Sequence, residues 1–134
     1  MKLILFNIIV SAILTTIILV TQFVNYPLLK YVYKDFSTFH QKYVTRIGYI
    51  VAPIMVLEFI ITTTMLLQDF DDSLKKISAL LVILIWLSTF FIQVPIHNQL
   101  SLSNKLNLNL LIHSNWIRVV CWILKLIISI ILFA

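Results

Sequence analysis

Glu58 and Lys125 are two opposite charges that stand inside long apolar stretches of this sequence. The chain of 134 residues is 61% hydrophobic and only 11% charged, so an ionisable side chain within such a stretch is unusual. A charge at the centre of a bilayer is costly unless it finds a partner, faces the interior of a helix bundle or lines a pathway. We therefore single out these two residues as candidates for an intramembrane charge pair.

Three histidines form a second group of residues that could do chemistry. Three imidazoles could bind zinc or copper, and two could ligate a haem iron. The sequence contains no HxxxH or HxxE pair, so we predict no metal site, and no cofactor can be named. We favour a polar pocket that hydrogen-bonds the head group of an organic ligand. Its predicted lining is His40, Tyr43, Arg46, Gln93, His97, Asn98, His113, Asn115, Trp116 and Arg118. The alternative is a polar layer in which each side chain meets water or a lipid head group.

Four apolar segments must position these residues. Each has close to the ~20 residues that cross a hydrocarbon core of roughly 30 Å. Backbone polar groups in lipid must be satisfied internally, so we expect helices rather than strands. The expected fold is all-α: a polytopic integral membrane protein with one domain over residues 1–134, an antiparallel four-helix transmembrane bundle. The expected spans are Leu3–Leu28, Val44–Leu67, Lys76–Ile96 and Leu110–Phe133.

The connections between these spans differ in character. The first suits the aromatic interface of the membrane, as a short helix lying on its surface, because it is rich in aromatic residues: Tyr26, Tyr31, Tyr33, Phe36 and Phe39. The second, Gln68 to Ser73, reads as a tight polar hairpin, and the third, Asn98 to Asn109, as a solvated loop. The spans form two helical hairpins between which we expect no residue-level repeat. We expect the predicted pocket to open toward the first and third connections.

Basic residues in the connections predict the orientation of the chain. More of them flank the first and third connections than the opposite side, and short cytoplasmic loops are enriched in Lys and Arg. We therefore expect both termini on the non-cytoplasmic side. The first group is Lys30, Lys34, Lys42, Arg46 and Lys105, and the second is Lys2, Lys75 and Lys76.

Polar residues recur at helical spacing in three of the spans. Such stripes should face the bundle interior, either to hold the helices together by hydrogen bonds or to line a site. The stripes are Asn7, Ser11, Thr15 and Gln22; Trp86, Thr89, Gln93 and His97; and Asn115, Arg118, Trp122, Lys125 and Ser129.

Spans two and four run in the same direction in this topology. Glu58 and Lys125 each lie about fourteen residues, or roughly 20 Å, along their spans, so they reach a similar depth. We therefore predict an ion pair between Glu58 and either Lys125 or Arg118. It could fix helix register, or it could carry a functional charge.

Two prolines interrupt the apolar spans. Pro95 in the third span removes a backbone hydrogen bond and should expose the carbonyl of Phe91, as happens near membrane sites. Pro53 should do likewise in the second span, freeing the carbonyl of Tyr49.

Four short motifs in the chain resemble those of a group of known proteins. Residues 39–43 (FHQKY), 86–89 (WLST), 93–98 (QVPIHN) and 115–118 (NWIR) resemble those of small bacterial four-helix membrane proteins of unknown function. That group is distantly similar to the anthrone oxygenase-like family, whose fungal members oxidise an aromatic polyketide without an evident metal. The resemblance covers nearly the whole chain and implies a bacterial inner (cytoplasmic) membrane. Its best match to a site pairs His97 and Asn98 with Asn115 and Arg118.

Several function classes do not fit. Gly48 is the single glycine, so there is no glycine-rich phosphate loop, and Cys121 is the single cysteine, so there is no CxxC pair. The net charge of +5 is spread over short loops and does not predict nucleic-acid binding. The expected partner is the lipid bilayer, with a homo-oligomer or a larger membrane complex left open. Three functions remain: an oxidoreductase- or oxygenase-like protein acting on an apolar or aromatic molecule, a non-catalytic binder of lipid, quinone or haem, and a structural subunit.

Overall fold

The computed structural model describes residues 1–102 and 105–134 and shows four long helical stretches. The first joins α1 (Lys2–Val20), a π-helix η1 (Thr21–Asn25), α2 (Tyr26–Leu28) and a 3₁₀ turn η2 (Leu29–Tyr31). The second is the single helix α3 (Phe36–Gln68). The third joins α4 (Ser73–Ser88), a second π-helix η3 (Thr89–Gln93) and α5 (Val94–Ser101). The fourth joins η4 (Lys105–Asn107), α6 (Leu108–Ser114) and α7 (Trp116–Phe133).

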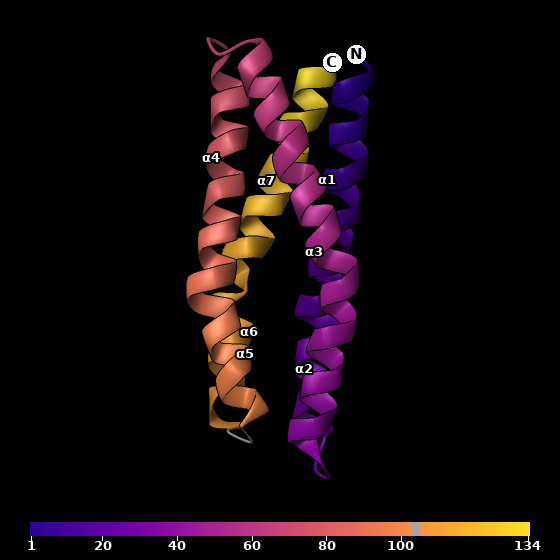
Figure 1. The fold of residues 1–134 in the computed structure, drawn as a ribbon, viewed down its shortest axis with the longest axis vertical. Helices are drawn as coiled ribbons and strands as arrows, with labels where there is room; N and C mark the ends of the chain where they lie inside the picture. Colours follow the sequence, from indigo (N-terminus) through magenta and orange to yellow (C-terminus); the bar gives the residue numbers. More distant parts are fainter. Residues whose placement is uncertain (103–104) are drawn as a thin grey trace.

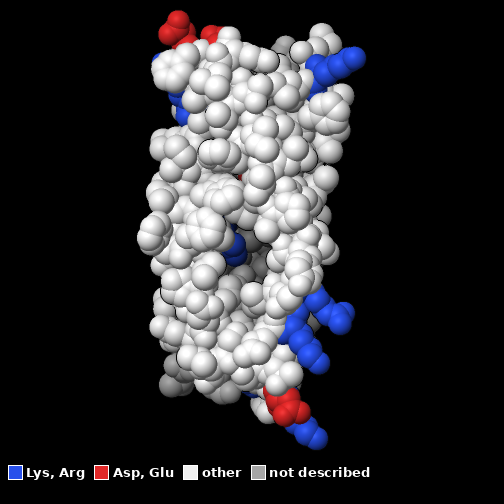
Figure 2. All heavy atoms as spheres, viewed as in Figure 1, with Lys and Arg blue, Asp and Glu red and all other residues white. Residues whose placement is uncertain are grey.

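All four stretches are long and apolar enough to cross a membrane. On the face that Figure 2 shows, the outer surface is uncharged along most of its height, and many of the charged side chains gather toward the two ends. The described residues form no strand. The prediction of an all-α, four-helix membrane protein is therefore confirmed.

The stretches run antiparallel (Figure 1). Both termini and the α3–α4 connection lie at one end, which we call the terminal end, and the other two connections lie at the opposite loop end. Both α3 and α7 pack against α1 and α4, so these two helices occupy opposite corners of the bundle. A core fills the space between them: Val10, Leu14, Ile18, Met55, Ile61, Met65, Leu81, Ile85, Val119, Cys121 and Trp122.

The helix α3 begins eight residues before the predicted start of its span. The aromatic segment before Val44 is therefore not a surface helix, and that prediction is wrong. Phe36 and His40 are buried against the loop end, and Ser37 donates a hydrogen bond to the Ser101 carbonyl. These contacts hold the segment in line with the rest of α3.

The other two connections are short. Asp72 accepts hydrogen bonds from the backbone of Leu74 at 2.8 Å and Lys75 at 3.4 Å, so it caps α4 and confirms the tight hairpin. At the loop end α5 continues to Ser101 and α6 starts at Leu108, so the predicted loop is mostly helical in its described part. Residues 103 and 104 of that predicted loop lie outside the described residues.

The first and third stretches share a short motif at residues 21–27 and 89–95, although we expected no residue-level repeat. Each π-helix begins at a threonine whose hydroxyl donates a hydrogen bond of 2.8 Å to the isoleucine carbonyl four residues earlier. Thr21 donates to Ile17, and Thr89 donates to Ile85. A proline follows six residues after each threonine. The two motifs read TQFVNYP and TFFIQVP, so they share threonine, phenylalanine, an amide residue and proline in register.

The prolines act differently in the three helices that contain them. Before Pro95, as before Pro27, the chain widens into a π-helix, a form that is frequent at functional sites. The expected disturbance near Phe91 is thus present as a π-turn. Around Pro53, by contrast, α3 continues without a change of helix type.

Candidate functional site

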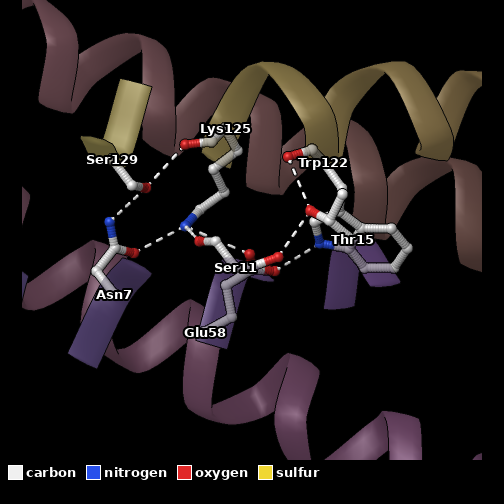
Figure 3. Close-up of polar contacts among 7 residues, drawn as sticks. All are labelled: Asn7, Ser11, Thr15, Glu58, Trp122, Lys125 and Ser129. Atoms are coloured by element: carbon white, nitrogen blue, oxygen red, sulfur yellow. Dashed lines mark hydrogen bonds and ion pairs between the residues drawn. The ribbon is translucent and has the colours of Figure 1, made fainter. Parts of the chain in front are cut away.

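Lys125 lies at the centre of a fully buried polar cluster (Figure 3). Its ammonium is 3.3 Å from Glu58 Oε1 and donates hydrogen bonds to Asn7 Oδ1 at 2.8 Å and Ser11 Oγ at 3.0 Å. The Lys125 and Glu58 side chains both have 0% exposure. The expected ion pair between opposite corners of the bundle is therefore present, and it involves Lys125 rather than Arg118.

The remaining groups of this cluster complete a closed network. Trp122 Nε1 donates to Glu58 Oε2 at 3.1 Å, so the indole supports the second carboxylate oxygen. Asn7 donates to Ser129 Oγ at 2.7 Å, and that hydroxyl donates to the Lys125 carbonyl at 2.7 Å. Because the two charges balance each other inside the core, this arrangement fits a structural pair that fixes the helices.

Arg118 lies two turns before Lys125 on α7 and has a different environment. Its Nε and one terminal nitrogen donate to Asn115 Oδ1 at 2.9 and 2.5 Å. The same terminal nitrogen contacts Tyr26 Oη at 3.3 Å and Gln93 Oε1 at 3.5 Å. The other terminal nitrogen has one recorded contact, with Thr89 Oγ1 at 3.5 Å, and is the least satisfied part of the guanidinium.

Every acceptor around Arg118 is neutral. Among the residues that the structure describes, Arg118 forms no salt bridge, although its exposure is only 8%. The single acidic residue within a span, Glu58, is already paired with Lys125. A buried cation supported only by neutral dipoles is costly and favours a negative charge next to it.

Both π-helices supply partners that hold Arg118 and the start of α7. Asn115 Nδ2 donates to Gln22 Oε1 at 2.7 Å, and Gln22 donates in turn to the Ile112 carbonyl at 3.0 Å. Gln93 Nε2 donates to Ser114 Oγ at 3.0 Å. The wide π-turns thus aim Gln22 and Gln93 at the α6–α7 junction.

A chain of hydrogen bonds leads from Arg118 to the loop end. Tyr26 Oη lies 3.1 Å from His97 Nε2, and His97 Nδ1 lies 2.9 Å from His40 Nε2. His40 Nδ1 is 2.9 Å from Ser101 Oγ at the end of α5. Two of the predicted site histidines are therefore in direct contact.

A cavity of 310 Å³ lies beside Arg118. Its walls come from all four stretches, and its lining includes the predicted residues Tyr43, Gln93, His97 and Arg118. Figure 2 shows a hollow on the side of the molecule, midway between its ends, with Lys or Arg atoms at its floor. Among the residues that line the cavity, Arg118 is the one with a basic side chain. The predicted opening toward the loops is wrong, because α3 and α5 meet there around His40 and Ser101.

Two buried donors at this cavity have no partner. Tyr43 Oη and Trp86 Nε1 belong to lining residues and make no hydrogen bond within the described part of the chain. Gly48 also lines the cavity, and a Cβ added there would meet no atom within 4 Å. The cavity therefore combines an apolar wall, open space beside a glycine and donors without acceptors.

Four predicted site residues do not join this group. Arg46, Asn98, His113 and Trp116 are all exposed. Within the described residues the His113 side chain forms one hydrogen bond, with the Asn109 carbonyl one turn earlier at 2.7 Å, and Trp116 packs edge-on against Phe23. The predicted cluster of three histidines is wrong because α6 turns His113 outward. Among the described residues no three His, Cys, Asp or Glu side chains lie together as a metal site would require.

Several residues of the site were not predicted for it. Tyr26 links Arg118 to His97, although we assigned it to the aromatic interface. Trp86 and Thr89 belonged to a predicted interior stripe, but nothing in that stripe distinguished cavity wall from helix contact. Gly48 carried a signal, since a lone glycine within a helix costs about 0.5–1 kcal/mol relative to alanine and often has a packing or functional reason.

Comparison of the chain with protein-family models, with curated proteins and with solved structures finds no match. The resemblance to the anthrone oxygenase-like family consequently stays a prediction. The function proposed below therefore rests on the geometry of the cavity.

Proposed function

We propose that this protein binds an amphipathic small molecule within the membrane, with the polar end of the ligand at Arg118 and its apolar body in the cavity. The observation that carries the proposal is the charge imbalance on α7. Lys125 has a carboxylate partner, whereas Arg118 has neutral acceptors and an adjoining cavity. A ligand that brings an anion or a carbonyl oxygen would complete the guanidinium's hydrogen bonds.

The lining of the cavity supports a ligand that accepts hydrogen bonds. Tyr43 and Trp86 offer a hydroxyl and an indole N–H that lack partners among the described residues. A buried donor without an acceptor costs about 1–3 kcal/mol, so an oxygen-bearing head group would recover part of that free energy. Most of the remaining wall is aliphatic or aromatic, which suits a hydrocarbon chain or a ring.

The position of the opening supports entry from the bilayer. The hollow lies on the apolar side of the molecule rather than at an end (Figure 2). The cavity volume of 310 Å³ is near the lower limit of the ~300–1,000 Å³ that small-molecule sites occupy. A molecule with one chain or one ring system fits this space better than a two-chain phospholipid does.

The test measures small molecules that co-purify with the protein, by mass spectrometry, in the wild type, Gly48→Leu and Gly48→Ala. A leucine at position 48 would fill open space at the cavity, whereas the alanine methyl leaves most of it free. We expect the ligand content to fall in Gly48→Leu and to persist in Gly48→Ala. Equal content in the two variants, with both folded by circular dichroism, would overturn the proposal.

An oxidoreductase-like activity is the second candidate. The observation that favours it is the Tyr26–His97 contact beside the cavity, since these groups could exchange protons with a bound aromatic molecule. It also fits the resemblance to the anthrone oxygenase-like family. A purified sample that leaves an anthrone unchanged in the presence of oxygen, while binding it in the cavity, would favour binding alone. A larger partner that stays with the protein through purification, with no bound small molecule, would instead indicate a structural subunit.

We place the protein in a bacterial inner membrane with both termini on the non-cytoplasmic side. The support is the excess of Lys and Arg at the loop end of the bundle, since cytoplasmic loops are enriched in these residues. With that orientation, the hydrogen-bond chain from Arg118 ends on the cytoplasmic side.

A further inference from the structure

The contacts between Arg118 and Ser101 form a directed chain of hydrogen bonds. An arginine can only donate, so the Tyr26 oxygen accepts from Arg118 at 3.3 Å. The other recorded partner of that oxygen is His97 Nε2 at 3.1 Å, and the Tyr26 side chain is only 3% exposed. The phenol hydrogen therefore points at His97 Nε2, where it finds an acceptor.

This polarity fixes the state of both histidines. If His97 Nε2 accepts, its hydrogen is on Nδ1 and is donated to His40 Nε2, 2.9 Å away. His40 then carries its hydrogen on Nδ1 and donates it to Ser101 Oγ at 2.9 Å. Every group in the chain is satisfied, and both imidazoles are neutral.

The chain joins two different environments. At one end, Tyr26, His97 and Arg118 all line the cavity. At the other, Ser101 lies at the last residue of α5, next to the exposed side chain of Gln41. Phe36 stacks on His40, and the ammonium of Lys105 lies 4.8 Å from the centre of the same Phe36 ring. In the described part of the chain, the titratable and charged groups near the two imidazoles are Tyr26, Arg118, Lys105 at the Phe36 ring and, across the cavity, Tyr43.

We propose that the ligand is a single-chain carboxylic acid, which enters from the bilayer as the neutral acid and binds as the carboxylate against Arg118, while its proton leaves through Tyr26, His97 and His40 to the loop end. This inference rests on the proposed function and names its ligand class. A neutral acid partitions into lipid far more readily than its anion does. A carboxylate is also the anion that the fork of an arginine binds best.

The proton transfer balances without any further reactant. The O–H bond of the acid breaks, and its proton joins the Tyr26 oxygen as the phenol proton moves to His97 Nε2. The Nδ1 proton of His97 moves to His40 Nε2, and the Nδ1 proton of His40 leaves by way of Ser101 to water. One carboxylate stays beside Arg118, and one proton appears at the loop end.

The test uses brominated dodecanoic acid and its methyl ester with the protein in phosphatidylcholine nanodiscs. Bromine quenches tryptophan fluorescence, and Trp86 and Trp122 both line the cavity. We expect saturable quenching with the acid at about tenfold lower concentration than with the ester, because the ester brings no charge to Arg118. An ester that binds as tightly as the acid would overturn the ligand class while leaving the binding pocket in place. No saturable quenching by either compound would count against the pocket itself.

The second part of the test follows the proton with a pH-indicator dye in stopped-flow mixing. Tyr26→Phe and His40→Gln should both release the proton about tenfold more slowly than the wild type. His40→Gln, whose side chain does not line the cavity, should still bind the acid within about threefold of the wild type. His113→Gln is the matched control, because His113 is exposed and is not part of the hydrogen-bond chain from Arg118 to Ser101. Release at the wild-type rate in both chain variants would overturn the proton path.

Discussion

Arg118 and Lys125 lie two turns apart on α7 and are both buried, yet in the described structure only Lys125 faces a carboxylate. Because Lys125 and Glu58 neutralise each other, the polar cluster that they form carries no net charge. Arg118 keeps its charge next to the cavity, where Asn115 accepts two of its hydrogen bonds and holds it in place. The two cations therefore have different surroundings, and our proposal assigns a structural role to Lys125 and a ligand-binding role to Arg118.

Removal of the Glu58 charge should destabilise the bundle. Loss of one member of a buried ion pair costs about 3–5 kcal/mol, because the other charge stays buried without compensation. We expect Glu58→Gln to lower the thermal unfolding temperature in detergent far more than Asp71→Asn, a change at an exposed residue of the α3–α4 hairpin. Equal shifts for the two variants would show that the pair adds nothing to stability.

An added carboxylate next to Arg118 should compete with the ligand. Asn115→Asp places a negative charge at the atom that now accepts from Arg118 at 2.9 and 2.5 Å. We expect the affinity for brominated dodecanoic acid to fall by about tenfold or more, with little change for the methyl ester. Asn115→Ala is the comparison, since it removes the contacts with Arg118 and Gln22 without adding a charge. An unchanged preference for the acid in Asn115→Asp would argue that Arg118 does not meet the ligand's head group.

Gly48→Ala should raise stability slightly. Glycine within a helix is about 0.5–1 kcal/mol less favourable than alanine, and a Cβ at this position meets no atom within 4 Å. The melting temperature of the variant should therefore be equal to or above that of the wild type. A clear decrease would mean that the space beside Gly48 is occupied, and it would remove the basis for using Gly48→Leu as a cavity block.

The orientation can be tested with single cysteines in a Cys121→Ala background. Asp71→Cys reports the terminal end, and Lys34→Cys, between η2 and α3, reports the loop end. We expect a membrane-impermeant maleimide added to spheroplasts to label Asp71→Cys and to leave Lys34→Cys unlabelled until the cells are opened. The reverse pattern would place both termini in the cytoplasm and the exit of the hydrogen-bond chain outside.

The sequence was sufficient for the fold class because composition alone demands four spans. It was also sufficient for the Glu58–Lys125 pair, since residue counts along parallel helices give depth directly. It could not predict that Tyr26 and His97 share the environment of Arg118. That contact depends on the π-turn at residues 21–25, which inserts one extra residue into the helix and rotates everything beyond it.

The site residues near the helix ends were the hardest to predict. His113 and Trp116 are residue types that commonly line a site, but they are exposed, because they lie on the outward face of α6 and α7. His40 lies before the apolar core of its span, and its burial follows from contacts with α5 that no periodicity reveals. Spacing predicts which residues share a helix face, but the facing helix decides whether that face is buried.

The most direct test of ligand binding at Arg118 is photo-crosslinking with a dodecanoic acid that carries a diazirine on its chain, followed by peptide mapping. We predict that the label falls on cavity-lining residues of α3 and α7, such as Val51, Met55 and Trp122, and that excess unlabelled acid removes it. The label should also be lost in Gly48→Leu and kept in Gly48→Ala. Labelling spread over lipid-facing residues such as Phe59, Ile60 and Leu80, with no competition by the unlabelled acid, would contradict a binding site in this cavity.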